Sequence, residues 1–123
     1  MCKLFIGADP HLWASTSRSM RFDGMVSSVR LENFFWNTLE EIASRDGLTV
    51  SKLINRLYFE SLEEGRDVSN LSSFLRVCCH RYLALQLAGL IPVSSGVPIS
   101  SLPVEQILEK EALQLSMRGV ARR

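Results

Sequence analysis

The chain has 123 residues, of which 46% are hydrophobic and 22% are charged, and its formal net charge at pH 7 is +1. These proportions are those of an ordinary folded domain and argue against a disordered polypeptide. A net charge so close to zero excludes a domain-wide basic surface, so any nucleic-acid surface has to be local. A domain of this size often completes its core against a second subunit, which makes oligomerisation an option from the start.

The three cysteines, Cys2, Cys78 and Cys79, cannot form a disulfide framework. Because the N-terminus also lacks the pattern of a secretory signal, we expect a cytoplasmic protein. No apolar stretch is long and continuous enough to cross a bilayer, so no membrane partner is expected. Neighbours such as Cys79 and His80 diverge on a helix and cannot easily share a metal ion. We therefore expect no metal and no other cofactor, and a thiol or metal enzyme is the weakest of three hypotheses.

Residues 1–17 are expected to form an N-terminal extension. Cys2–Ile6 is short and apolar, which predicts a strand. Asp9 and Pro10 predict the N-cap and the first position of a helical turn. Residues 14–19 are predicted to be a polar connector.

Residues 18–31 contain two alternating runs on either side of Asp23-Gly24, a dipeptide that favours a tight hairpin turn. Alternation with period two gives the hairpin one apolar and one mostly polar face. The apolar face would carry Met20, Phe22, Met25, Val29 and Leu31, and the polar face Ser19, Arg21, Val26, Ser28 and Arg30.

From Glu32 onward the hydrophobic period becomes that of a helix. The first helix, Asn33–Arg45, ends near Gly47, and the second, residues 50–64, begins after Thr49 as its N-cap. The core stripes of the two helices are Phe35, Leu39, Ile42 and Ala43 in the first, and Val50, Leu53, Ile54, Leu57 and Leu62 in the second. Phe34 and Trp36 lie off the first stripe, and we expect both to be core residues that pack against the third helix or a partner chain, and not an exposed binding patch.

A third helix, capped by Asn70, is predicted over residues 71–90. Its apolar stripe is Leu71, Phe74, Leu75, Cys78, Tyr82 and Leu85. Pro92, Pro98 and Pro103 with intervening serines and glycine predict a linker, and Val104–Met117 predicts a last helix. Because this helix is short and the linker lacks apolar periodicity, the segment beyond Pro92 is expected to be dispensable for folding.

The expected organisation is an N-terminal extension (1–17), a strand-helix-helix domain (18–66), a third helix packed on it (67–91), a Pro/Ser linker (92–103), and a C-terminal helix with a basic tail (104–123). The fold class is mainly α with a short β-ribbon. A strand at residues 26–31 needs a neighbour for its N–H and C=O groups, and the same strand of a second chain could supply one about a two-fold axis. The expected dimer core is Val29, Leu31, Phe35, Leu39 and Ile54.

Residues 26–64 carry a resemblance to a known family. The strand Val-Ser-Ser-Val-Arg-Leu, the helix that follows, the turn Asp-Gly-Leu-Thr and the second helix are similar to the ribbon-helix-helix fold of the MetJ/Arc type. A longer stretch, residues 18–43, resembles an uncharacterised bacterial subgroup of that fold. The resemblance implies a homodimer, or a tetramer built from it, that binds double-stranded DNA and regulates transcription, in most cases as a repressor.

The resemblance also implies which residues contact DNA. A two-stranded ribbon fits the major groove of B-DNA, about 12 Å wide, and the family's alternation places base contacts on Val26, Ser28 and Arg30. Its phosphate contacts fall at the start of the second helix, where free N–H groups favour an anion. The phosphate-contacting set is Thr49, Val50, Ser51 and Lys52, together with Arg18 and Arg21 if residues 18–22 lie on the DNA backbone. An extra strand at 18–22 departs from the family pattern, because a four-stranded sheet is too wide for the groove.

A second hypothesis keeps the same fold but assigns a different function to the chain. The chain would be a protein-interaction module or an antitoxin whose C-terminal helix, Val104–Met117, binds a protein partner at the end of the Pro/Ser linker. The sequence has no glycine-rich phosphate loop, nucleophile elbow or zinc-ligand spacing, so no enzyme is expected.

Overall fold

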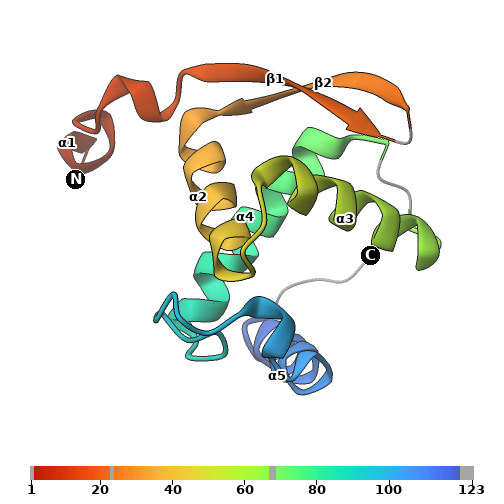
Figure 1. The fold of residues 1–123 in the computed structure, drawn as a ribbon. Helices are drawn as coiled ribbons and strands as arrows, with labels where there is room; N and C mark the ends of the chain where they lie inside the picture. Colours follow the sequence, from red (N-terminus) through yellow and green to blue (C-terminus); the bar gives the residue numbers. More distant parts are fainter. Residues whose placement is uncertain (1, 23, 67–68, 120–123) are drawn as a thin grey trace.

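The chain folds into a two-stranded antiparallel ribbon that lies across one end of a group of helices (Figure 1). The computed structural model describes residues 2–22, 24–66 and 69–119. In chain order the elements are α1 (Cys2–Ile6), η1 (Pro10–Leu12), β1 (Ser15–Phe22), β2 (Met25–Glu32), α2 (Asn33–Arg45), α3 (Val50–Glu63), α4 (Leu71–Leu87), η2 (Ile99–Ser101) and α5 (Val104–Met117), where η marks a short 3-10 helix. This order confirms the predicted fold class, mainly α with a short β-ribbon and an additional C-terminal helix.

The predicted hairpin is present, with Phe22 opposite Met25 beside the turn. Gly24 has a φ of +82°, which a residue without Cβ adopts at little cost and which a tight Asp-Gly hairpin turn requires. The other residue predicted for this turn, Asp23, lies outside the described residues, as does the end of the basic tail, residues 120–123.

The first strand starts earlier than predicted. β1 begins at Ser15, so the expectation of a connector over residues 14–19 is wrong. The ladder reaches the base of the hairpin and one step beyond it, where the amide of Asn33 donates to the carbonyl of Ala14 at 2.8 Å. These paired backbone groups keep a serine-rich segment extended, although its side chains alone give no strong strand signal.

The helix boundaries follow the predicted caps. Gly47 has a φ of +67° after the end of α2. At the start of α3 the Thr49 hydroxyl accepts a hydrogen bond from the Lys52 amide at 3.2 Å, and at the start of α4 the Asn70 side chain accepts one from the Ser73 amide at 3.1 Å. Each side-chain oxygen satisfies one N–H group that the first turn of a helix leaves without a partner.

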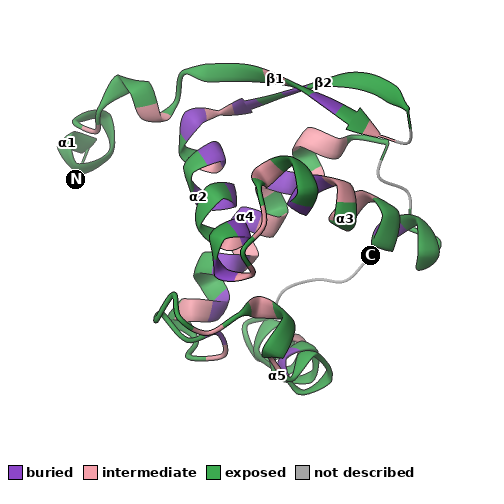
Figure 2. Cartoon of the chain, in the orientation of Figure 1, coloured by how far each residue is buried: buried purple, intermediate pink, exposed green. Residues whose placement is uncertain are grey.

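The main core lies directly under the hairpin, where buried residues gather on the ribbon's inner face and on α2, α3 and α4 (Figure 2). Val29 and Leu31 are 3% and 0% exposed, and Trp36 is 1% exposed. The expectation that Trp36 is a core residue is therefore confirmed. Phe34 is 54% exposed within one chain, and its packing against a partner chain stays a prediction.

The expectation that β2 needs a second chain as its hydrogen-bonding neighbour is wrong. β2 pairs with β1 of its own chain, so one side of this strand is satisfied without a second subunit. The five residues predicted for the dimer core lie in the core of one chain: Val29, Leu31, Leu39 and Ile54 are buried, and Phe35 is partly buried against them. A folded monomer is therefore compatible with this structure, and a dimer needs other support.

A second cluster of buried side chains joins α4 to the C-terminal segment. It consists of Tyr82, Leu85, Ile91 and Ile107. On α4 the buried cysteine is Cys79, whereas Cys78, predicted on the core stripe, is only partly buried. α5 is also held by an ion pair, in which Arg81 Nε lies 2.9 Å from a Glu111 carboxylate oxygen.

The segment after Pro92 is bonded to α2 through Arg45. This attachment disagrees with the expectation that the segment is dispensable for folding. The guanidinium of Arg45, a residue only 5% exposed, donates to the carbonyls of Pro92, Ser94 and Val97 at 2.8, 2.9 and 2.9 Å. Sequence periodicity could not reveal these contacts, because the acceptors are backbone groups.

The N-terminal segment differs from prediction at one point. Cys2–Ile6 is a short helix and not a strand, closed by a hydrogen bond from the Gly7 amide to the Lys3 carbonyl at 3.0 Å. No described strand edge lies beside it, so an extended conformation would have no hydrogen-bonding neighbour. The Asp9 cap is confirmed, because its carboxylate accepts from the His11 amide at 3.0 Å.

Candidate nucleic-acid interface

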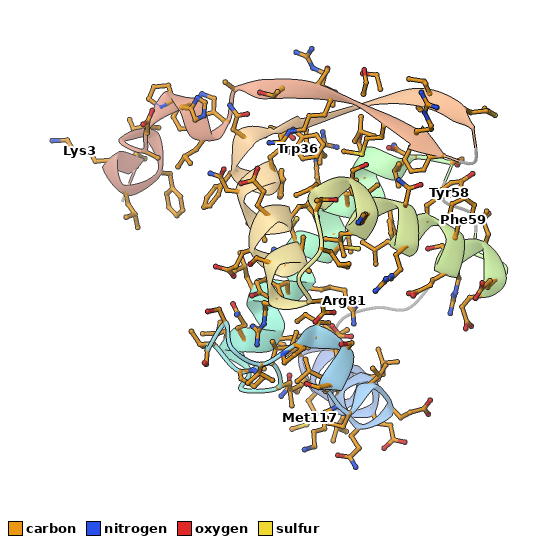
Figure 3. All side chains as sticks on the ribbon, viewed as in Figure 1. Lys3, Trp36, Tyr58, Phe59, Arg81 and Met117 are labelled. Carbon is orange, nitrogen blue, oxygen red and sulfur yellow. The ribbon has the colours of Figure 1, made fainter. Side chains whose placement is uncertain are left out.

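The outer face of the hairpin, turned away from the helices, carries polar side chains from both strands (Figure 3). We call these residues the outer row: Ser15, Ser17, Ser19 and Arg21 of β1, and Val26, Ser28, Arg30 and Glu32 of β2. All of them except the partly buried Glu32 are exposed. The inner face, by contrast, contains the buried Met20, Val29 and Leu31.

Cross-strand pairing joins the outer row into adjacent pairs. Arg21 lies opposite Val26, Ser19 lies opposite Ser28, and Ser17 lies opposite Arg30. Among the residues that the structure describes, neither Arg21 nor Arg30 forms an ion pair. Two guanidinium groups on an exposed face, without a carboxylate partner in contact, are free to bind an external anion or a base edge.

The centre of the hairpin is fixed from below by Trp36, which lies beneath the strands (Figure 3). Its indole N–H donates to the Thr16 carbonyl at 2.9 Å. The guanidinium carbon of Arg18 lies 4.4 Å from the centre of the Trp36 ring, and one Arg18 nitrogen lies 3.0 Å from the Glu40 carboxylate. These contacts join the inner side of β1 to α2.

The base of β2 is fixed by α4. Arg76 Nε donates to the Glu32 carboxylate at 2.9 Å, and the Ser72 hydroxyl donates to the Arg30 carbonyl at 3.1 Å. The pKa of the Glu32 carboxyl lies below its ordinary value, first because its backbone amide hydrogen bonds to the carboxylate and second because Arg76 does. Arg30 therefore projects from a segment of backbone that is held in place.

The N-terminus of α3 lies beside β1. A shallow hollow between these elements is lined by Arg18, Ser19, Met20, Glu40, Ala43, Leu48, Thr49, Val50 and Ser51. The first-turn amides of Val50 and Ser51 have no partner in the preceding turn of a helix, and together with the helix dipole they favour an anion. Lys52 is exposed at the same end of the helix. The hollow therefore combines a helix N-terminus with the Arg18 guanidinium, which is paired there with the Glu40 carboxylate.

Comparison with known proteins supports what this geometry indicates. A family model described as a ribbon-helix-helix domain matches residues 15–83, from the first residue of β1 into α4. The chain belongs to the ribbon-helix-helix family. The match confirms the resemblance seen in the sequence and extends it, because both strands of the hairpin and much of α4 lie within the matched domain.

One solved structure is closely similar to this ribbon-helix-helix chain. It is that of an uncharacterized protein from Bordetella pertussis Tohama I, which is 49% identical, with a TM-score of 0.82, over 88% of this chain and 86% of its own. No curated protein matches this chain. Ribbon-helix-helix domains form a family of DNA-binding regulators, so the family assignment supports nucleic-acid binding in general.

The structure brings some of the predicted site residues together and separates others. Val26, Ser28 and Arg30 share the outer face of β2, as the alternation predicted, and Thr49 to Lys52 form the first turn of α3. Arg18 and Arg21, both predicted to contact phosphates, lie on opposite faces of β1. Arg18 faces α2 and the hollow, whereas Arg21 belongs to the outer row.

Sequence analysis missed several residues of this ribbon-helix-helix surface. Ser17 and Ser15 continue the outer row toward the base of β1, and the period-two pattern could have been extended back to them. Ser72 and Arg76, which hold the base of β2, come from α4 and have no local signal in the sequence.

Across residues 2–22, 24–66 and 69–119, no group of three or more His, Cys, Asp or Glu side chains is arranged to hold a metal ion. Within the same described ranges, no helix combines the length and the apolar character needed to span a bilayer.

Proposed function

We propose that this ribbon-helix-helix protein is a sequence-specific regulator of transcription, acting as a repressor in the cytoplasm. The observation that carries the proposal is the contrast between the two faces of the hairpin. One face is buried on the helices, and the other presents Ser28 and Arg30, and Arg30 has no ion-pairing partner among the described residues.

The outer face has the chemistry that direct readout requires. Arg30 can donate two hydrogen bonds to O6 and N7 of a guanine, Ser28 can donate or accept at a base edge, and Val26 can contact a thymine methyl group. Because Ser72 and Arg76 hold the base of β2, the backbone that carries Arg30 would lose little conformational entropy on binding.

Phosphate contacts would come from the start of α3. The amides of Val50 and Ser51 and the side chains of Thr49 and Lys52 would meet one phosphate beside the groove, and Arg18 would reach it from the other side of the hollow. Such contacts set the register of the protein on the duplex and supply affinity that does not depend on sequence.

The protein would act as a homodimer on two half-sites, in agreement with the way ribbon-helix-helix domains in general bind DNA. Exposed apolar side chains on α3, Phe59 and Leu62, and on α5, Val104 and Leu108, supply area that a second chain could cover. Light scattering at micromolar concentration tests this part. A mass near twice 13.9 kDa is expected, and a mass of one chain with full helicity would contradict the dimer.

The test of DNA binding is selection from a random pool of duplex DNA by the purified full-length chain, followed by binding isotherms on the enriched site. Arg30→Ala is expected to bind the selected site about 5- to 150-fold more weakly and to lose discrimination at one base pair. Ser27→Ala is the matched control, because Ser27 is exposed on the same strand and has the opposite orientation. Failure to enrich any sequence would argue against the proposal.

A protein-interaction module or antitoxin is the alternative, and the position of α5 does not favour it. Ile107 is buried against α4, and Arg81 is bonded to Glu111, so this helix already has a partner in its own chain. The alternative requires α5 to be released on binding, which hydrogen exchange in the presence and absence of a partner would detect.

A further inference from the structure

We propose that an apolar cavity between helices α2, α3 and α4 and the C-terminal segment is a binding site for a small, uncharged and mainly apolar molecule. The cavity has a volume of about 280 Å³ and lies where the two clusters of buried side chains meet. Leu39 of the main core and Leu85 and Ile107 of the second cluster all belong to its wall. The inference goes beyond the proposed function and does not depend on DNA binding.

The size of the cavity distinguishes it from an ordinary packing defect. Protein interiors are close-packed and leave few voids larger than a water molecule. An apolar cavity of about 150 Å³ stays dry and can bind benzene. In proportion, a cavity of about 280 Å³ has room for a molecule nearly twice the size of benzene, such as naphthalene or octanol.

The wall of the cavity is mainly aliphatic. Leucine, isoleucine and valine side chains make up most of it, and the other described members are Asp46, Cys78, Arg81 and Tyr82. A wall of this kind offers many dispersion contacts and few hydrogen bonds. Sites for small molecules are typically concave and apolar with a small number of polar groups, and the cavity has this composition.

The polar groups of the wall already have partners. The Tyr82 hydroxyl accepts a hydrogen bond from Arg45 at 3.1 Å, and the Asp46 carboxylate accepts one from the Ser100 amide at 3.2 Å. Arg81 is bonded to the carboxylate of Glu111, as described above. Among the described residues of the wall, Asp46 and Arg81 carry opposite charges that cancel. A charged ligand would lose its hydration without gaining a free counter-ion, so the wall favours an uncharged one.

Polar contacts hold the walls of the cavity apart. Arg45 of α2 donates to carbonyls within residues 92–97, and Asp46 at the end of α2 accepts from Ser100 in η2. The ion pair of Arg81 joins α4 to α5 (Figure 3). If α5 moved onto α3 and filled the cavity, these contacts would have to lengthen or break. The cavity is therefore formed before a ligand arrives, which lowers the cost of binding.

The mouth of the cavity lies beside α5. Val104 and Leu108 belong to the wall and yet are 58% and 48% exposed, so the cavity opens to solvent next to them. A second chain that covered these two side chains would close the mouth. The inner wall, which includes Leu39 and Tyr82, is buried within one chain. A small molecule can reach this inner wall, whereas the surface of another folded subunit meets only the mouth.

Direct binding of naphthalene and of octanol to the purified full-length chain tests the proposal. Calorimetry should show saturable binding at a single site per chain. Methyl NMR should locate the ligand, with the largest shift changes at Ile42, Ile99 and Ile107, which belong to the wall. Ile54 is the internal control, because it is buried in the main core and is not part of the wall.

Absence of saturable binding, or largest shift changes away from the wall, would overturn the proposal. An affinity for octanol that falls as the protein concentration rises would overturn it too, because it would mean that a second copy of the chain fills the cavity. None of these measurements contains DNA, so their outcome is independent of whether the chain selects a DNA site.

Variants that fill the cavity provide the second test. Cys78 belongs to the wall, whereas its neighbour Val77 is 54% exposed and does not. Cys78→Phe places a ring in the cavity and should weaken naphthalene binding at least about 10-fold, and Val77→Phe should leave it unchanged. Leu108→Trp and Leu113→Trp are a second matched pair on α5, of which only Leu108 belongs to the wall, and this pair decides if Cys78→Phe does not fold. Folded filling variants that bind naphthalene as tightly as wild type would overturn the proposal.

Octanoate and octylamine test the chemical class of the ligand, because each keeps the chain of octanol and adds a charge. Both should bind at least about 10-fold more weakly than octanol, since Asp46 and Arg81 already have partners and cannot neutralise a buried charge. Binding of either charged compound as tight as that of octanol would overturn the assignment to an uncharged ligand.

Discussion

The guanidinium of Arg18 stacks on the indole of Trp36, with 4.4 Å from its central carbon to the centre of the ring. Trp36 in turn donates to the Thr16 carbonyl of the same strand, two residues before Arg18. Trp36 therefore contacts β1 twice, through the Arg18 side chain and through the Thr16 carbonyl, and both contacts attach the hairpin to α2.

Removing the stacked cation should loosen this attachment. Arg18→Ala is expected to lower the free energy of unfolding by about 1 kcal/mol, from the lost cation–π contact and the partly exposed ion pair with Glu40. Urea denaturation measures the change, and Trp36 fluorescence should report greater exposure of the indole. Arg21→Ala serves as the control, because that side chain makes no such contact, and equal destabilisation by the two variants would contradict the prediction.

The pair of Glu32 and Arg76 should make the attachment of β2 to α4 dependent on pH. Because the pKa of Glu32 is lowered in the folded state, its contribution to stability is present above the ordinary value of 4.5 and is lost as pH falls through the lowered value. Glu32→Gln should therefore cost up to about 1 kcal/mol at about pH 7, and the difference from wild type should shrink toward about pH 3.

Urea midpoints at several pH values test this expectation, with Glu105→Gln in the exposed first turn of α5 as the control. A difference between wild type and Glu32→Gln that is the same at both ends of the pH range would mean that the carboxylate charge is not what matters.

Arg45 should be one of the most costly positions to change. Its guanidinium joins the end of α2 to three carbonyls beyond Ile91 and to the Tyr82 hydroxyl. Replacing it with methionine keeps much of the stem but leaves these acceptors without their donor, at a cost of roughly 3 kcal/mol. Truncation after Ile91 removes the same contacts, so the two changes together should cost much less than their sum. Full additivity in thermal or urea denaturation would show that Arg45 acts elsewhere.

The cysteines should react in the order of their exposure. Cys2 is exposed, whereas burial first and then the neighbouring Cys78 raise the pKa of Cys79 to about 12. At about pH 8 a disulfide reagent should modify Cys2 quickly and Cys79 only on unfolding. Because the folded-state pKa is raised, this thiol should also cost stability progressively as pH rises from about 9 toward 12. Rapid modification of Cys79 in the native protein would contradict the burial and revive the thiol hypothesis.

What the sequence could predict here depended on local chemistry. Gly24, Gly47 and Thr49 occupy turns and caps whose requirements are set within a few residues, and the alternation of β2 assigned Val29 and Arg30 to opposite faces without any tertiary information. These predictions agree with the structure because backbone geometry alone decides them.

The failures came from contacts between distant segments. The helical stripe of α2 does not show where β1 lies, so it could not indicate that Trp36 packs beneath β1 while Phe34 stays exposed within one chain. Cys2–Ile6 has apolar residues of either helix or strand character, and it forms a helix because no strand edge adjoins it in the described chain. The attachment of the segment after Pro92 depends on Arg45 donating to backbone carbonyls, which any sequence could provide.

The phosphate contacts proposed at the start of α3 lead to a last prediction, which separates affinity from specificity. Lys52 is exposed in the first turn of α3, next in sequence to Val50 and Ser51, which line the hollow. A lysine that neutralises one phosphate releases counterions whatever the base sequence. Lys52→Ala should therefore weaken binding to selected and scrambled duplexes by the same factor, and it should reduce the slope of log affinity against log salt by about one per chain.

Lys110→Ala is the matched control, because this lysine is exposed on α5 at the opposite end of the molecule from the hairpin (Figure 1). Isotherms at several salt concentrations give both quantities at once. A loss confined to the selected site would mean that Lys52 contacts a base, and an unchanged slope would move the phosphate away from the N-terminus of α3.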